Sequence, residues 1–292
     1  MRGADSPDRS NPALGEQLSC NVTHRLLPSA KLLSPAARHT MSGALSWTSV
    51  LAWRMSSQHL RARAPRSAML DVVSDIAGAH AQLMSSAELT LWARVESLER
   101  GMVEKALWEE RTLVKTWAMR GTLHLLPAHE LPLWVAAQAA LKPRHENASW
   151  LRYFGLNREE AEALLAAIPQ ALDGRVLTRE ELAREVGRRM SSPALAEKLR
   201  ESWGALLKPS AFRGDLCFAP SEGRNVCFAR PNEWLASWEE VPSDVAIRDV
   251  VRRYLTAYGP AGREEFARWF GARSPAEAER LIRRLGDEVT RV

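Results

Sequence analysis

The sequence contains little cysteine and no long hydrophobic run. Only three cysteines occur in 292 residues, and Cys20, Cys217 and Cys227 do not have the spacing of a metal-binding cluster. Their odd number argues against the disulfide framework of a small secreted protein. No apolar run reaches the roughly 18 residues that a membrane-spanning helix needs. We therefore expect a cytoplasmic protein without a membrane partner.

The common motifs of nucleotide-binding and hydrolytic enzymes are missing as well. The sequence has no Walker phosphate loop, no HExxH, no Gly-x-Ser-x-Gly and no zinc-ligand spacing. It therefore predicts neither a cofactor nor a metal. What the chain does have is a net charge of +5 and 11 tryptophans. The basic balance permits a nucleic-acid partner without proving one, and the tryptophans are expected to anchor hydrophobic cores.

Residues 1–40 differ from the rest of the chain. They hold scattered Pro, Ser, Asn and Arg with no sustained periodicity, and they lack the apolar segment of a signal peptide. We expect this segment to be disordered, or to be an extension created by a start codon placed too early. Met41 would then be the natural first residue. A transit-type extension is the alternative.

The remaining sequence predicts a mainly α-helical protein with short β-hairpin wings. Helical patterns lead to β-prone runs around Arg120-Gly121, and the pattern recurs around residues 221–225. Helices followed by a hairpin describe a winged helix, so we expect winged helices over 41–130 and 131–240. A third unit over 241–292 has helices but no hairpin, and we expect it to be incomplete. "TREELAREVG" and "GREEFARWFG" match at six of ten positions, which gives modest support for a repeat.

Two polar side chains follow Gly78 just before a helical pattern. In a helix, His80 and Gln82 would point about 200° apart, whereas in an extended segment they would project to the same side. Gly78 suits the end of one helix, and Ser85 and Ser86 with Glu88 offer a start for the next. We therefore place His80 and Gln82 in a non-helical connection. They either satisfy backbone groups there or act together on a ligand.

Basic and polar residues at or beside both hairpins fit contacts to DNA phosphates. A solvated basic surface is the alternative for each of them. His124 is either a DNA contact or a capped structural residue. The candidate DNA-binding residues are Arg54, Gln58, Arg61, Lys115, Arg120, His124, Lys142, Arg144, Arg213, Arg224 and Arg230.

Five separated blocks carry a resemblance to a known family. They are "WRMSSQHL", "IAGAHAQ", "TWAMRGTLHLLPA", "GDLCFAPSEGRNVCFARP" with "NEWL" after it, and "YLTAYGPAGREEFARWFG". In this order they resemble the AlkZ/YcaQ-type winged-helix bacterial DNA glycosylases over about residues 45–290. The resemblance implies tandem winged helices, here with the family's C-terminal β-barrel absent. It also implies excision of bulky N-alkylated purines, in some members the unhooking of interstrand crosslinks, and self-resistance in antibiotic producers.

The family's catalytic signature is a Gln, an apolar residue and a second Gln or an Asp. His80, Ala81 and Gln82 stand at these positions, and His80 in place of the first Gln is a departure shared by some self-resistance members. The resemblance implies that His80 and Gln82 are catalytic and hold the attacking water. It further implies a monomeric, nucleoid-associated glycosylase acting on double-stranded DNA with alkylated purines.

Two other interpretations stay open. A non-catalytic winged-helix protein, such as a transcription regulator, would bind DNA and cleave nothing. A truncated, inactive remnant would merely fold.

Overall fold

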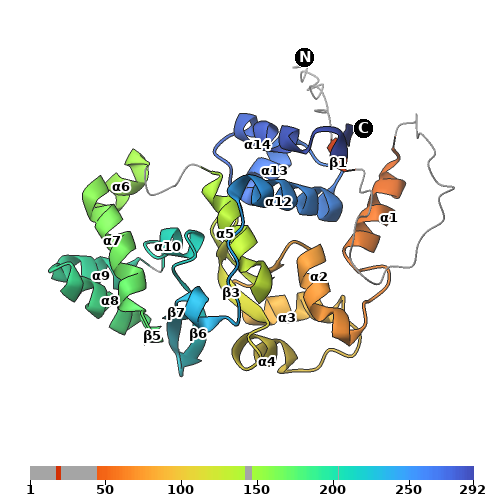
Figure 1. Ribbon diagram of the computed structural model, residues 1–292. Helices are drawn as coiled ribbons and strands as arrows, with labels where there is room; N and C mark the ends of the chain where they lie inside the picture. Colours follow the sequence, from red (N-terminus) through yellow and green to blue (C-terminus); the bar gives the residue numbers. More distant parts are fainter. Residues whose placement is uncertain (1–17, 21–44, 142–146, 203) are drawn as a thin grey trace, which may run out of the picture.

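The computed structural model describes residues 18–20, 45–141, 147–202 and 204–292, and it is mainly helical with three small antiparallel sheets in these ranges (Figure 1). The elements up to the first hairpin are β1 (Leu18–Cys20), α1 (Trp47–Ser57), η2 (Arg66–Ala68), α2 (Met69–Asp75), β2 (Ala79–His80), α3 (Met84–Trp92), α4 (Met102–Trp108), β3 (Leu113–Ala118) and β4 (Thr122–Pro127).

The elements up to the second hairpin are η3 (Ala128–Glu130), α5 (Leu131–Ala139), α6 (Ala148–Phe154), α7 (Arg158–Ala171), β5 (Leu177–Thr178), α8 (Arg179–Arg189), α9 (Pro193–Glu201), α10 (Lys208–Phe212), β6 (Cys217–Glu222) and β7 (Asn225–Ala229). The last group comprises α11 (Pro231–Trp234), α12 (Ser243–Tyr258), α13 (Arg263–Phe270), α14 (Pro275–Ile282), η5 (Arg283–Glu288) and β8 (Val289–Arg291).

Both predicted hairpins are present, and their sheets share one strand order. The first sheet runs β2-β4-β3 and the second runs β5-β7-β6, all antiparallel. In each, a short strand from between two helices pairs with the second strand of the hairpin. Gly121 and Gly223 have positive φ angles of 89° and 61° at the turns, a conformation that glycine adopts without steric cost. The two sheets are therefore built on the same plan.

The sequence echo between α8 and α13 extends to the way each helix begins. Thr178 precedes α8 and donates its backbone N–H to Glu181 Oε2 over 2.9 Å, while its hydroxyl accepts from the Glu181 N–H. This reciprocal pair of bonds is a capping box. At α13, Gly262 donates its N–H to Glu265 Oε2 over 3.1 Å. A glutamate three residues into each helix thus satisfies the same backbone donor.

The three largest hydrophobic cores among the described residues include one that crosses the expected unit boundary. One core joins α2, α3 and α4 to the first sheet, and a second joins α7, α8 and α9 to the second. The third contains α12–α14 together with α5, whose Trp134 lies 6.2 Å from the ring of Trp269. Thus α5, expected to open the second unit, shares its core with the third, and Figure 1 shows it lying in the centre of the molecule.

The two hairpin sheets also pack on each other. Trp117 of β3 lies 4.7 Å from the Phe218 ring of β6 and 6.1 Å from the Phe228 ring of β7. Such aromatic pairs add stabilisation beyond their buried area. The contact fixes the first hairpin against the second.

Two short strands near the opposite ends of the sequence pair with each other. Strand β8 pairs with β1, so Leu18–Cys20 have regular structure where the sequence predicted none. No other part of 1–40 lies within the described residues.

Cys217 and Cys227 are free thiols of the second hairpin. They lie opposite Ala229 and Ala219 rather than each other, and burial raises the pKa of both. None of the helices in the described ranges is long and apolar enough to cross a membrane.

Candidate active site

Strand β2 leads into a short connection, and exposed and buried side chains alternate from residue 79 to 82. The side chains of Ala79 and Ala81 are 1% and 0% exposed, whereas His80 and Gln82 are exposed. Ala81 donates its backbone N–H to the Leu123 carbonyl of β4 over 2.7 Å, which continues the pairing of β2. The chain bends at Gln82 and Leu83 before α3 begins, so His80 and Gln82 lie in a non-helical connection, as expected from the sequence.

The turn before this segment depends on Gly78. Its φ of +94° is a conformation that side chains rarely adopt, and a Cβ there would lie 2.8 Å from Leu126 Cδ2. Gly78 also donates its N–H to the Val73 carbonyl over 2.8 Å, which closes the end of α2 as expected. The start of the next helix differs from expectation. Leu83, which is extended, stands before α3, so the helix begins at Met84 without a side-chain cap. The prediction that Ser85 and Ser86 start the helix is therefore wrong, since both lie within its first turn.

A comparison of the two hairpin sheets shows what is particular to this segment. His80 pairs with His124 in the first sheet as Thr178 pairs with Cys227 in the second. Helix α8 begins directly after Thr178, whereas residues 81–83 separate His80 from α3. Gln82 lies in this connection and is therefore outside the helix.

His124 lies directly across the strand ladder from His80. The two rings are 5.5 Å apart between centroids in an edge-to-face arrangement, and His124 is only 4% exposed. Its Nδ1 lies 2.9 Å from the Thr122 carbonyl, so Nδ1 carries the proton. Burial is the main cause that lowers the pKa of His124 to about 4, against the bond to Thr122, which raises it. Of the two interpretations of His124, the satisfied structural residue fits this geometry.

The third unit supports the backbone that leads into this site. Tyr258, at the end of α12, donates its hydroxyl to the Ile76 carbonyl over 2.8 Å, just before Gly78. Burial raises the pKa of Tyr258, and nearby Arg94 lowers it. Arg94 is half-buried, and its Nη2 donates to Gln58 Oε1 over 3.3 Å. Neither Tyr258 nor Arg94 stood out in the sequence, because their importance comes from contacts between units.

Two of the candidate DNA-binding residues hold α1 against the third unit. Arg54 donates to the carbonyls of Gly259 and Pro260 over 3.2 and 2.8 Å, and Gln58 donates to the Ala257 carbonyl over 3.1 Å. These bonds give both side chains a structural function. Their contact with DNA remains a prediction.

The other candidates near the first hairpin point in different directions. Lys115 lies on the opposite face of the sheet from His124, with its Nζ 5.5 Å from the centre of the Phe218 ring, and burial lowers its pKa. Arg120 is exposed in the turn between β3 and β4, and Arg61 is exposed beyond the end of α1. Lys142 and Arg144 lie outside the described residues.

The candidates near the second hairpin are mostly ion-paired. Arg213 lies 3.2 Å from Asp215, and Arg230 lies 2.7 Å from Asp173. Arg224 is exposed at the turn, where it lines a pocket of about 290 Å³ whose other lining residues are Thr178, Arg179, Glu180, Arg200, Asn225 and Val226. The structure thus brings His80 and His124 together, with Gln82 exposed two residues after His80, while the arginines spread along both hairpins.

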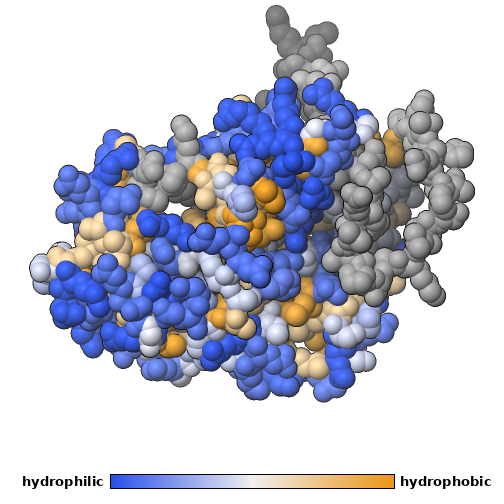
Figure 2. Space-filling view, viewed as in Figure 1, coloured by the Kyte–Doolittle hydropathy of each residue, from blue (hydrophilic) through white to orange (hydrophobic). Residues whose placement is uncertain are grey.

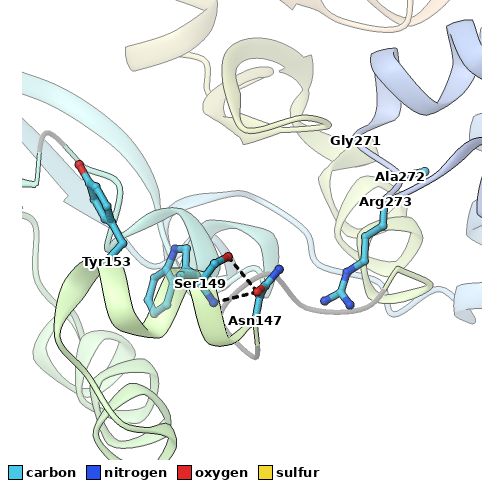
Figure 3. A pocket seen from close by; sticks show the side chains of 7 residues that line it. Asn147, Ser149, Tyr153, Gly271, Ala272 and Arg273 are labelled. Carbon is cyan, nitrogen blue, oxygen red and sulfur yellow. Dashed lines mark hydrogen bonds between the residues drawn. The ribbon is translucent and has the colours of Figure 1, made fainter.

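A larger pocket, of about 410 Å³, lies away from all of these residues, where α6 approaches the loop before α14 (Figure 3). Asn147 accepts hydrogen bonds there from the backbone and hydroxyl of Ser149. Across the pocket, the Arg273 side chain points towards Asn147, whereas Tyr153 points away.

Figure 2 shows a mostly hydrophilic face, with hydrophobic side chains gathered near its centre over α5. Within the described ranges, no group of three or more His, Cys, Asp or Glu is placed to hold a metal ion.

Comparison with known proteins decides the family. The family model described as DNA glycosylase AlkZ-like matches residues 73–292, which include the whole His80–Gln82 segment. The chain belongs to the AlkZ-like family. The interstrand DNA cross-link repair glycosylase of Streptomyces sahachiroi is 38% identical over 255 residues, which cover 85% of this chain and 67% of that relative. The solved structure of Streptomyces sahachiroi DNA glycosylase AlkZ superposes with a TM-score of 0.76 at 36% identity, covering 84% of this chain and 67% of the other.

Proposed function

We propose that this member of the AlkZ-like family is a monofunctional DNA glycosylase that removes bulky N-alkylated purines. N7-alkylguanine adducts are the main substrates in this proposal. The name of the Streptomyces relative extends them to interstrand crosslinks. The observation that carries the proposal is the pair of exposed polar side chains, His80 and Gln82, which flank the fully buried Ala81 in the non-helical connection before α3.

The chemistry of the lesion matches what such a pair can do. An N7-alkylated guanine carries a positive charge, so it leaves without being protonated. The site must then hold a water near the anomeric carbon as an oxocarbenium-like state forms. A neutral imidazole of His80 accepts the proton of that water. Gln82 cannot act as a base, but its carboxamide orients the water. General-base assistance of this kind contributes about 10²–10⁴ in rate.

The proposed DNA-binding architecture is a series of winged helices. The first and second units each place helices, a short strand, further helices and a hairpin in the same order, with the same strand pairing. We assign 41–130 and 131–240 to these two winged helices and 241–292 to the third unit, with α5 packed on the third. The turns that carry Arg120 and Arg224 contact the phosphate backbone, and a monomer binds one duplex.

The decisive test is base release from a duplex with one N7-methylguanine under single-turnover conditions. His80→Ala should slow release by about 10²–10⁴, and Gln82→Ala should slow it as well. His129→Ala and Gln170→Ala are matched controls, because both side chains are exposed elsewhere. If the His80 and Gln82 variants release the base as fast as the wild type, the assignment of the site is wrong.

Binding of the same duplex separates the proposal from its rivals. Phosphate contacts require affinity to fall steeply between about 50 and 200 mM salt, because counterions are released on binding. Affinity that does not change with salt would contradict the proposed phosphate contacts. Tight binding without base release by the wild type would favour a transcription regulator.

A further inference from the structure

His80 is the first of three residues that lie side by side across the first sheet. His80, His124 and Thr116 lie opposite one another on β2, β4 and β3. Directly opposed residues of antiparallel strands have their side chains on the same face, about 4.5–5.5 Å apart at Cβ. Exposure falls along this row from exposed His80 to 4% for His124 and 1% for Thr116. His80 is therefore the solvent end of a row that begins in the core.

His124 is fixed in this row more firmly than its neighbour. Its ring is buried and is held by the bond from Nδ1 to the Thr122 carbonyl at 2.9 Å. Because burial lowers its pKa to about 4, it stays neutral at pH 7 and does not repel a charge on His80. The exposed His80 ring lies edge-to-face with it at 5.5 Å. A fixed, neutral ring thus restricts the rotamers of a mobile one.

We infer that His124 is a positioning residue that holds the His80 imidazole in the orientation in which it takes the proton of the attacking water. This inference rests on the proposed function, since it assigns a purpose to the orientation of His80. A catalytic group needs neighbours that lock its rotamer, because a loosely held group spends little time in the productive geometry. The alternative is that His124 only bonds to the Thr122 carbonyl. It would then be a structural residue with no effect on His80.

The test compares His124→Val, which removes the ring from a strand position, with His124→Phe, which keeps a ring. Both lose the bond to Thr122 equally, so a difference between them reports the ring contact. Base release from the N7-methylguanine duplex should slow roughly 2- to 12-fold in His124→Val, the range that one aromatic pair supplies. His124→Phe should stay closer to wild type, and the dissociation constant for the duplex should not change in either.

A double-mutant cycle shows whether the effect passes through His80. In a His80→Ala background, His124→Val should cause no further slowing, because there is no imidazole left to position. An equal slowing in both backgrounds, or a loss explained by weaker DNA binding, would overturn the inference.

The NMR signals of the His80 ring give a readout that needs no activity. They should show contacts to the His124 ring in the wild type and should shift in His124→Phe and His124→Val. If the wild type releases no base, the proposed function fails, yet absent ring contacts would separately overturn the orientation of His80. If His124→Val does not fold, the wild-type ring contacts and His124→Phe still decide.

Discussion

A buried ion-pair network joins the third unit to the helix before the candidate site, and Glu130→Gln is the change that tests it. Glu130 is 8% exposed, and its Oε1 accepts from Ser74 Oγ over 2.6 Å and from Arg253 Nη1 over 2.9 Å. Ser74 lies in α2, Glu130 in η3 and Arg253 in α12. Arg253 also pairs with Asp249 over 2.6 Å. One carboxylate therefore connects three elements.

The expected loss in the free energy of unfolding depends on the interactions that Arg253 and the new glutamine retain. Removing one member of a buried pair costs about 3–5 kcal/mol, because the other charge stays buried without compensation. Arg253 retains Asp249, and the glutamine carbonyl oxygen, which has two lone pairs, can still accept from both Ser74 and Arg253, so the loss should lie below that range. We expect Glu130→Gln to reduce the free energy of unfolding by about 2–3 kcal/mol.

Urea denaturation measures this loss. With a slope of about 2–3 kcal/mol/M, the midpoint should fall by about 1 M at unchanged slope. Glu264→Gln is the matched control, because Glu264 pairs with Arg263 at 3.0 Å and its side chain is 50% exposed, a pair worth less than about 1 kcal/mol. A midpoint for Glu130→Gln that falls no further than that of the control would refute the reasoning.

Three further predictions concern the site and its support. Gly78→Ala should destabilise the protein by about 1–3 kcal/mol more than Gly101→Ala, because both glycines have positive φ but only Gly78 would place its Cβ 2.8 Å from Leu126; similar thermal midpoints would contradict this. His124→Phe should reduce the pH dependence of stability. The unfolded imidazole takes up a proton below about pH 6.5, but folded His124 takes one up only near pH 4, so the wild type should lose up to about 1.4 kcal/mol per pH unit between these values relative to the variant. Tyr258→Phe should cost about 1 kcal/mol in urea denaturation, because it removes the 2.8 Å bond to the backbone at the end of α2; unchanged stability would show that this bond contributes nothing.

Much of the local structure could be predicted because its causes are local. Arg120-Gly121 between β-prone runs specifies a tight turn, and Thr178 with Glu181 specifies a helix start, wherever the segment ends up in the fold. The non-helical connection after Gly78 was predictable for the same reason, since that glycine ends a helix. These features need only the identities of neighbouring residues.

The contacts between units could not be predicted, because their causes lie far apart in the sequence. Arg54 has the appearance of a phosphate ligand, yet it donates to carbonyls about two hundred residues away. Nothing near α5 in the sequence indicates that Trp134 packs on Trp269 rather than on the second unit. A basic or aromatic side chain carries no local signal for whether DNA or another helix is its partner.

The position of the candidate pair depends on one local difference between two similar sheets. If α3 began directly after His80, as α8 begins after Thr178, Gln82 would lie in the first turn of the helix. Residues 81–83 keep it outside the helix, and the bond from Ala81 to the Leu123 carbonyl continues the strand pairing by one residue. The second sheet keeps the same plan, but its matching threonine is buried and caps a helix. The three residues between β2 and α3 therefore make the difference between the two sheets. The first sheet can present two polar groups to solvent, whereas the second only stabilises the fold.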